Sequence, residues 1–118
     1  MKNFLRSLFW IVFFVVTLLS LLPATQLPLN IFDWWDKAQH ILAFFFLGSI
    51  GLLAYSSNPL RLVFSLLIFG ILIELAQVAS GWRYGDWQDW LADSVGVGIA
   101  YLAYFFWKLS KLKYHTLR

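Results

Sequence analysis

Four long apolar segments alternate with short polar ones along the 118-residue chain. They cover about residues 5–22, 39–55, 62–79 and 91–107. Each is close to the roughly 20 residues that a helix needs to cross a bilayer core of about 30 Å. The three prolines lie between the segments, where a missing backbone N–H costs least. The pattern therefore predicts an all-α integral membrane bundle of four transmembrane helices, with residues 1–118 forming one domain.

The first segment has one alternative interpretation, a cleaved signal peptide, because Lys2 and Arg6 form a basic N-terminal region. Its apolar part exceeds the usual length of roughly 7–15 residues, and no A-x-A-like cleavage site follows it. We therefore expect the segment to be retained as a helix of the mature protein.

The composition supports a membrane protein and excludes several other classes. Hydrophobic residues make up 61% of the chain and charged residues 13%, whereas soluble proteins average roughly 45–50% and about 25%. The many aromatic residues also argue against disorder. The absence of cysteine excludes disulfides and thiolate metal sites. The net charge of +3 comes from scattered residues, so no nucleic-acid partner is expected.

The basic residues indicate an orientation. With both termini in the cytoplasm, seven of the nine Lys and Arg residues lie on the cytoplasmic side, as the positive-inside rule favours. Only Lys37 and Arg83 then lie on the outer side, in loops that also carry five of the seven tryptophans. We expect these tryptophans to form an aromatic belt at the depth of the lipid headgroups.

All six acidic residues fall on the outer half of the protein under this topology. Most are expected in the outer loops, and Glu74 is expected within the third helix. Three pairs of polar residues are spaced three or four residues apart and therefore share a helix face: Asp36 and His40, Glu74 and Gln77, Asp89 and Asp93. We expect the three polar faces to meet near the outer membrane surface.

The fourth predicted helix carries two contrasting stripes. One is polar at its outer end and small below it: Asp89, Asp93, Gly96, Ala100 and Ala103. The other is bulky: Leu91, Val95, Leu102 and Phe106. Because small residues let helices approach closely in lipid, the small stripe is predicted to face the bundle and the bulky stripe to face the lipid.

Glu74 is the acidic residue predicted to lie deepest in the membrane. An ionisable residue there is a functional-site hypothesis by default, because burying its charge is costly. The alternative is an ionic clasp, in which Glu74 pairs with Lys37 or Arg83 and only holds the helices together. The sequence leaves both interpretations open.

His40 and the outer acidic residues raise the question of a metal ion, because imidazole and carboxylate groups are ligands of Zn²⁺ and Mn²⁺. Their spacing matches no established metal motif such as H-E-x-x-H. No metal ion and no other cofactor is therefore expected. The chain also lacks G-x-S-x-G, P-loop and dinucleotide-binding motifs.

Three short motifs follow one another along the chain: Asp36-Lys37-x-x-His40, Glu74-x-x-Gln77, and Arg83-x-x-Asp86-x-x-Asp89 before Gly96. In this order and on four spans, they resemble the VanZ-like family of small bacterial membrane proteins over about residues 36–98. The family pattern at the last motif resembles D-x-x-A-N-x-x-G, and here Asp93 replaces the asparagine.

The resemblance implies a multi-pass protein of the bacterial plasma membrane, in a family whose founding member accompanies resistance to the glycopeptide antibiotic teicoplanin. It does not imply a settled biochemical activity. It also implies that the candidate site consists of the motif residues: Asp36, Lys37, His40, Glu74, Gln77, Arg83, Asp86 and Asp89.

Three functions fit these residues. The first is a cell-envelope binding protein with an outward polar pocket for a membrane lipid, a lipid-linked cell-wall precursor or a lipoglycopeptide. Lys37 and Arg83 would hold its phosphate or carboxylate. The second is a membrane-embedded enzyme for a lipid-linked substrate, with His40 or Glu74 as general acid or base and Asp36 orienting His40. The third is a structural partner subunit whose polar residues are only a clasp.

Overall fold

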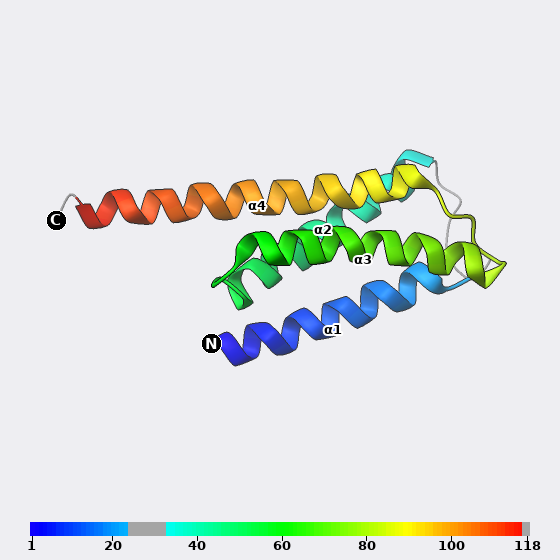
Figure 1. Cartoon of the computed structure of the whole chain (residues 1–118), viewed down its shortest axis with the longest axis horizontal. Coiled ribbons are helices and arrows are strands. Elements are labelled where there is room, and N and C mark those ends of the chain that lie inside the picture. The colour runs from blue at the N-terminus through cyan, green and yellow to red at the C-terminus, as the bar shows by residue number, and fades with distance from the viewer. Residues whose placement is uncertain (24–32, 117–118) are drawn as a thin grey trace.

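The computed structural model describes residues 1–23 and 33–116, which form four α-helices. They are α1 (Lys2–Leu21), α2 (Asp33–Ala54), α3 (Pro59–Ser80) and α4 (Trp87–Thr116). All four are long and apolar enough to cross a membrane. Successive helices run in opposite directions, so the start of α1 and the end of α4 lie at the same end of the bundle (Figure 1). The predicted all-α bundle of four candidate spans is confirmed.

The helices extend beyond the apolar segments that predicted them. α2 contains segment 39–55 except for its last residue and begins six residues before it, and segment 91–107 lies inside α4, which has 30 residues. Hydropathy marks only the part of a helix suited to the bilayer core, whereas the backbone hydrogen bonds continue into polar residues. Asp36 and Asp89, which we expected in loops, therefore lie on helices. The side chains of Asp33, Trp34 and Trp35 lie outside the described residues.

Local sequence signals set both ends of α3. The Asn58 side chain accepts a hydrogen bond from the backbone N–H of Arg61 at 3.2 Å, and Pro59 occupies the first turn, where its fixed φ suits a helix. Gly81 ends the helix with a left-handed φ of 77°, which glycine adopts without steric cost. The chain then turns back toward the start of α4.

The most extensive helix contact joins α2 and α4, and α1 packs against α2 and α3. Gly96 on α4 lies directly against the backbone of α2. A Cβ atom there would overlap the carbonyl oxygen of Ile41 and lie 2.9 Å from the backbone nitrogen of Phe45. The absence of a side chain therefore permits the close approach of the two helices.

The two stripes of α4 point as predicted, with one exception. The small stripe is buried at Asp89, Asp93, Gly96 and Ala100. The bulky stripe is exposed at Leu91, Val95, Leu102 and Phe106. Ala103 is the exception, because it is exposed and lines a cavity of about 320 Å³ with Leu53 and Trp107.

Aromatic side chains join α1 to its neighbours. Phe13 stacks on Phe69 of α3 with ring centroids 4.2 Å apart, and Phe9 meets the ring of Tyr55 edge to face. Trp10 donates a hydrogen bond to the Tyr55 hydroxyl at 3.1 Å. Such pairs add specific geometry to apolar burial. Ring packing therefore contributes to the position of α1, together with the aliphatic core that includes Val16.

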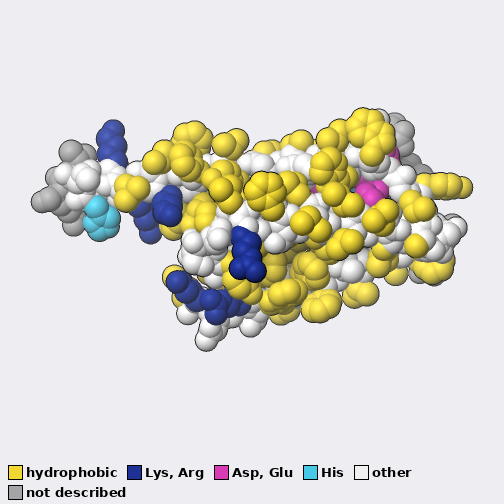
Figure 2. Space-filling view, viewed as in Figure 1, with side chains coloured by type: hydrophobic (Ala, Val, Ile, Leu, Met, Phe, Trp, Pro, Cys, Tyr) yellow, Lys and Arg dark blue, Asp and Glu magenta, His cyan; other side chains and the backbone are white. Residues whose placement is uncertain are grey.

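Charged side chains separate toward the two ends of the bundle. In the view of Figure 2, Lys and Arg side chains gather toward the end with the termini, and acidic side chains appear only near the opposite end. We call the latter the acidic end: there α1 and α3 finish and α2 and α4 begin. Which end faces the cytoplasm remains a prediction from the positive-inside rule.

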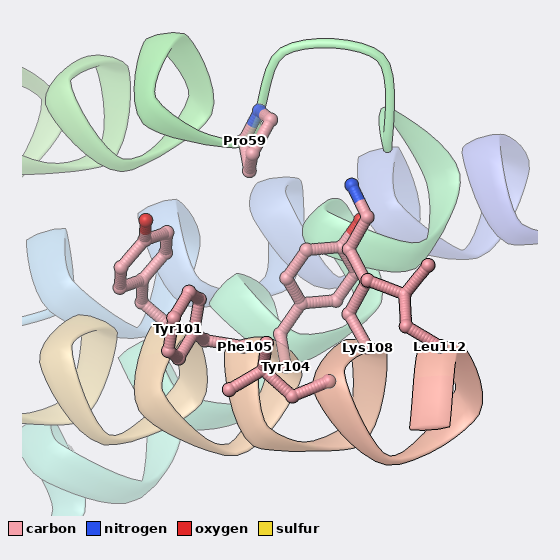
Figure 3. Close-up of a pocket in the computed structure, with 7 residues that line it drawn as sticks. Pro59, Tyr101, Tyr104, Phe105, Lys108 and Leu112 are labelled. Carbon is pink, nitrogen blue, oxygen red and sulfur yellow. The ribbon is translucent and has the colours of Figure 1, made fainter. Parts of the chain in front are cut away.

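A second cavity, of about 310 Å³, lies near the end with the termini. Figure 3 shows Pro59 across from a row of α4 side chains that includes Tyr101, Tyr104 and Lys108. None of the candidate residues from the sequence motifs lines either of the two cavities. Those residues are found at the acidic end instead.

Candidate binding site at the acidic end

Lys37 on α2 connects to two aspartates around the start of α4. Its Nζ lies 2.8 Å from Oδ2 of Asp86 and forms a second ion pair with Oδ1 of Asp89. The Asp86 side chain is 39% exposed and the Asp89 side chain only 6% exposed. The Lys37 ammonium, together with the N–H of Gln88, holds the pKa of Asp86 below its ordinary value. Lys37 therefore links α2 to α4 from the surface into the interior.

Asp86 also connects the start of α4 to Glu74 on α3. Its Oδ1 accepts a hydrogen bond from the N–H of Gln88 at 2.9 Å, which caps the helix. Its own backbone N–H donates to Oε2 of Glu74 at 2.7 Å. In residues 1–23 and 33–116, Glu74 forms no ion pair with Lys37 or Arg83, so the clasp offered as the alternative interpretation of Glu74 is not observed.

His40 and Asp93 form a buried pair between α2 and α4. Nδ1 of His40 lies 2.8 Å from Oδ1 of Asp93, and the two side chains are 10% and 1% exposed. An ionised carboxylate only accepts hydrogen bonds, so Nδ1 donates. Asp93 therefore orients the imidazole ring, a role that the sequence had offered to Asp36. The signal for Asp93 was its position one turn after Asp89 on the same face.

The other ring nitrogen of His40 points toward further carboxylates. Nε2 lies 3.8 Å from Oδ2 of Asp89, which is too far for a hydrogen bond. Asp36 lies one turn before His40 on α2, and one ligand atom from each of Asp36, His40 and Asp89 lies within 4.8 Å of the others. Two helices thus direct one nitrogen and two oxygens toward a common point.

We call these residues the acidic cluster: Asp36, Lys37, His40, Glu74, Asp86, Asp89 and Asp93. Its charges do not balance, because five carboxylates face one ammonium and one imidazole. Oε1 of Glu74 and Oδ2 of Asp93 are buried and have no hydrogen-bond partner in the described part of the chain. The three polar faces predicted from the sequence do meet, with more acidic groups than partners for them.

The remaining motif residues, Gln77 and Arg83, serve the end of α1. The last carbonyl groups of a helix lack partners within it and need donors from elsewhere. Three side chains supply them: Gln77 Nε2 to Ser20 O at 2.9 Å, Trp82 Nε1 to Leu21 O at 3.0 Å, and Arg83 Nη1 to Leu22 O at 3.5 Å. We call this set the α1 anchor. Its member Trp82 was missed as a hydrogen-bonding residue.

The two outer cations thus have different partners. Lys37 is paired with Asp86 and Asp89, whereas Arg83 contacts the end of α1. The expectation that both hold one phosphate or carboxylate of a ligand stays a prediction. The observed pairing of Lys37 makes an ammonium or hydroxyl donor the more suitable partner for this cluster.

The tryptophans of the α3–α4 region fall into two groups, exposed and inward-facing. Trp82 and Trp87 are 58% and 68% exposed, as an aromatic belt requires. Trp90 instead turns inward, where its Nε1 donates to the carbonyl oxygen of Leu67 on α3 at 3.0 Å. Trp90 therefore helps to fix α4 against α3, and the belt prediction applies here to Trp82 and Trp87.

Comparison with known proteins adds a family assignment. The model of the VanZ/LLP1 family matches residues 2–108, which include α1, α2, α3 and most of α4. No match is found among curated proteins or among solved structures. The family match agrees with the resemblance drawn from the three sequence motifs and covers more of the chain than they do.

Proposed function

The chain belongs to the VanZ/LLP1 family and is a multi-pass membrane protein, and we propose that its acidic cluster binds the polar head of an amphipathic molecule of the bacterial cell envelope. The candidates are a membrane lipid, a lipid-linked cell-wall precursor and a lipoglycopeptide. In this proposal the protein lies in the plasma membrane with both termini in the cytoplasm, so that the acidic end faces outward.

The charge imbalance of the cluster carries the proposal. A residue set that only clasped helices together would pair each buried charge, because an unpaired one destabilises the fold. Here the Glu74 and Asp93 carboxylates each keep one buried oxygen without a partner among the described residues. Ionisable groups kept in a membrane segment at such a cost favour a functional role over a purely structural one.

The unpartnered carboxylate oxygens of Glu74 and Asp93 also indicate the chemistry of the ligand. Carboxylate oxygens accept hydrogen bonds, so they suit a head that offers ammonium or hydroxyl groups, as aminolipids, glycans and glycopeptides do. Trp87 and Tyr84 are exposed at the same end, at 68% and 96%. Amphipathic rings at this depth suit the boundary between a polar head and an acyl chain.

The test uses the full chain in lipid nanodiscs and measures binding through tryptophan fluorescence. The probes are phosphatidylethanolamine, a lipid-linked cell-wall precursor and teicoplanin. The variants are Glu74→Gln and Asp93→Asn, which keep the side-chain shape, and the matched control is Gln88→Ala at an exposed position of α4. We expect at least one probe to saturate with the wild type and the control and to bind about 10-fold more weakly to the variants, since each loses a charged hydrogen bond. Equal affinity of all four proteins for every probe would refute the proposal.

The His40–Asp93 pair favours one second candidate, a membrane-embedded enzyme acting on a lipid-linked substrate. An imidazole oriented by a carboxylate is a common arrangement for a general base. The measurement is release of phosphate or glycan from a lipid-linked substrate by the purified protein. Activity is expected to fall at least about 100-fold in His40→Ala, the usual scale for loss of a general base. Undiminished turnover by this variant would exclude the role.

A further inference from the structure

We propose that Asp36, His40 and Asp89 bind a divalent transition-metal ion such as Mn²⁺ or Zn²⁺. One ligand atom from each residue lies within 4.8 Å of the other two. The inference goes beyond the proposed function, because the ion binds without an envelope ligand. The spacing along the chain did not predict it, since two ligands come from α2 and the third from α4.

His40 directs one ring nitrogen toward the proposed site. Its Nδ1 lies 2.8 Å from Oδ1 of Asp93, so Nε2 is the ring nitrogen left to bind a ligand. Histidines that bind metals in proteins have this arrangement, with a carboxylate on the nitrogen that faces away from the ion. The His40 side chain is 10% exposed, and in the described part of the chain no hydrogen bond reaches Nε2.

Nε2 of His40 points toward carboxylate oxygens of two helices. The nearest of them, Oδ2 of Asp89, lies 3.8 Å away, which is too far for a hydrogen bond. A cation between these two atoms and Asp36 would bind one ligand atom from each of the three residues. The arrangement of the neighbouring charges leaves room for it, because Lys37 pairs with the other oxygen of Asp89, Oδ1.

The charge of the cluster supports a divalent ion. The five carboxyl groups of the cluster outnumber its one ammonium group, that of Lys37. A divalent cation removes half of the resulting excess in a region where unpaired charge is costly. The mixed donor set selects the metal: imidazole suits Zn²⁺ and carboxylate suits Mn²⁺, whereas Mg²⁺ and Ca²⁺ prefer oxygen ligands alone.

Three protein ligands leave coordination positions open. An ion there would accept a phosphate or hydroxyl oxygen from a bound head, which gives an acidic cluster the means to hold an anionic lipid. This second step rests on the proposed function. The first step, binding of the ion alone, does not.

The experiment measures binding of Mn²⁺ alone to the full chain in nanodiscs of neutral lipid. The protein carries no histidine tag and is first treated with a chelator, and free Mn²⁺ is followed by electron paramagnetic resonance. The variants are His40→Ala and Asp36→Asn. Asp36 is partly exposed, so its replacement is expected to leave the fold intact. The matched control is Gln39→Ala, which changes the exposed residue next to His40.

We expect one Mn²⁺ per chain in the wild type and the control, displaced by Zn²⁺ but not by equal concentrations of Mg²⁺ or Ca²⁺. His40→Ala and Asp36→Asn should weaken binding by about 100-fold or more. Asp93→Leu, which removes the hydrogen bond to Nδ1 together with one buried carboxylate of the cluster, should weaken it by roughly 10- to 100-fold. Mn²⁺ should also raise the melting temperature of the wild type and leave that of His40→Ala unchanged.

Absence of saturable Mn²⁺ and Zn²⁺ binding up to about 1 mM overturns the inference, as does equal affinity of His40→Ala and the wild type. The proposed function fails separately. If Mn²⁺ binds as expected but no lipid, precursor or glycopeptide does, the metal site stands and the envelope ligand is wrong. If the ligand binds equally with and without the chelator, the second step is wrong.

Discussion

Two groups of polar side chains lie at the acidic end, and they differ in the groups that they contact. In the α1 anchor, Gln77, Trp82 and Arg83 each donate to a terminal carbonyl group of α1, although Oε1 of Gln77 is buried without a partner among the described residues. In the acidic cluster, the carboxylates outnumber their donors and two buried oxygens remain unpartnered within the described residues. Residues of one motif set thus divide into a part that contacts the end of α1 and a part for which we propose a ligand.

The largest expected effect concerns the framework of the cluster, the close packing of α2 and α4. Gly96→Ala places a methyl group against the backbone of Ile41 and Phe45. Helix separation should lower the free energy of unfolding by about 3 kcal/mol, the upper range for overpacking. The measurement is chemical unfolding in detergent. In the control Gly98→Ala, the new methyl group has no neighbour within 4 Å, so stability should be unchanged or slightly raised. Equal effects of both variants would contradict the close approach.

The next largest effect concerns the ion pair between Lys37 and Asp89, whose contribution to stability can be measured separately from its contribution to binding. Lys37→Met leaves the nearly buried Asp89 without its cation, which should cost about 2 kcal/mol of stability, less than a fully buried pair because Lys37 is 27% exposed. The double variant Lys37→Met/Asp89→Leu should recover most of that loss but bind neither Mn²⁺ nor an envelope ligand. A double variant that is stable and still binds both would show that this pair lies outside the site.

A smaller effect is expected in the α1 anchor. Gln77→Leu removes the donor to Ser20 and should destabilise the fold by about 1 kcal/mol, with Mn²⁺ affinity unchanged. Stability is measured by thermal unfolding and affinity by the Mn²⁺ titration. The exposed Gln88→Leu serves as the control and should change stability by less than about 0.5 kcal/mol. If Gln77→Leu bound Mn²⁺ more weakly and Gln88→Leu did not, the α1 anchor and the acidic cluster would belong to one site.

The smallest effect is a dependence on pH at the surface of the cluster. Because Lys37 and the N–H of Gln88 lower the pKa of Asp86 in the folded protein, its contribution to stability is fully present above the unfolded pKa of about 3.9. The contribution is lost as the pH falls through the lower folded value. The wild type should therefore melt at a higher temperature than Asp86→Asn at pH 6, and the difference should shrink below about pH 4. A difference in melting temperature that does not change with pH would contradict the ion pair between Lys37 and Asp86.

The helices and the faces of α4 were predictable because lipid and bundle interior demand opposite residue types. Leu91 and Val95 are exposed and Gly96 and Ala100 are buried, as the stripes of α4 predicted. Helix ends were less predictable, since hydropathy does not report where a polar helical turn continues outside the bilayer core. Asp89 therefore lies in α4 rather than in a loop.

Partners across helices could not be predicted from spacing. The i,i+4 rule relates Asp36 to His40 on one helix, but the hydrogen bond from His40 reaches Asp93 on another. Likewise, one of the two interpretations of Glu74 paired it with a cation, whereas in the structure it accepts a hydrogen bond from the backbone N–H of Asp86. These contacts depend on the rotation and depth of each helix.

Hydrophobic length and charge position are properties of the chain alone, so an all-α membrane bundle with its acidic residues gathered at one end was predictable from the sequence. How those residues divide depends on the packing of the helices. It directed Gln77 and Arg83 to the end of α1 and His40 to Asp93. A polar side chain forms its hydrogen bonds with groups that lie within about 3 Å. The packing of the helices determines which groups those are.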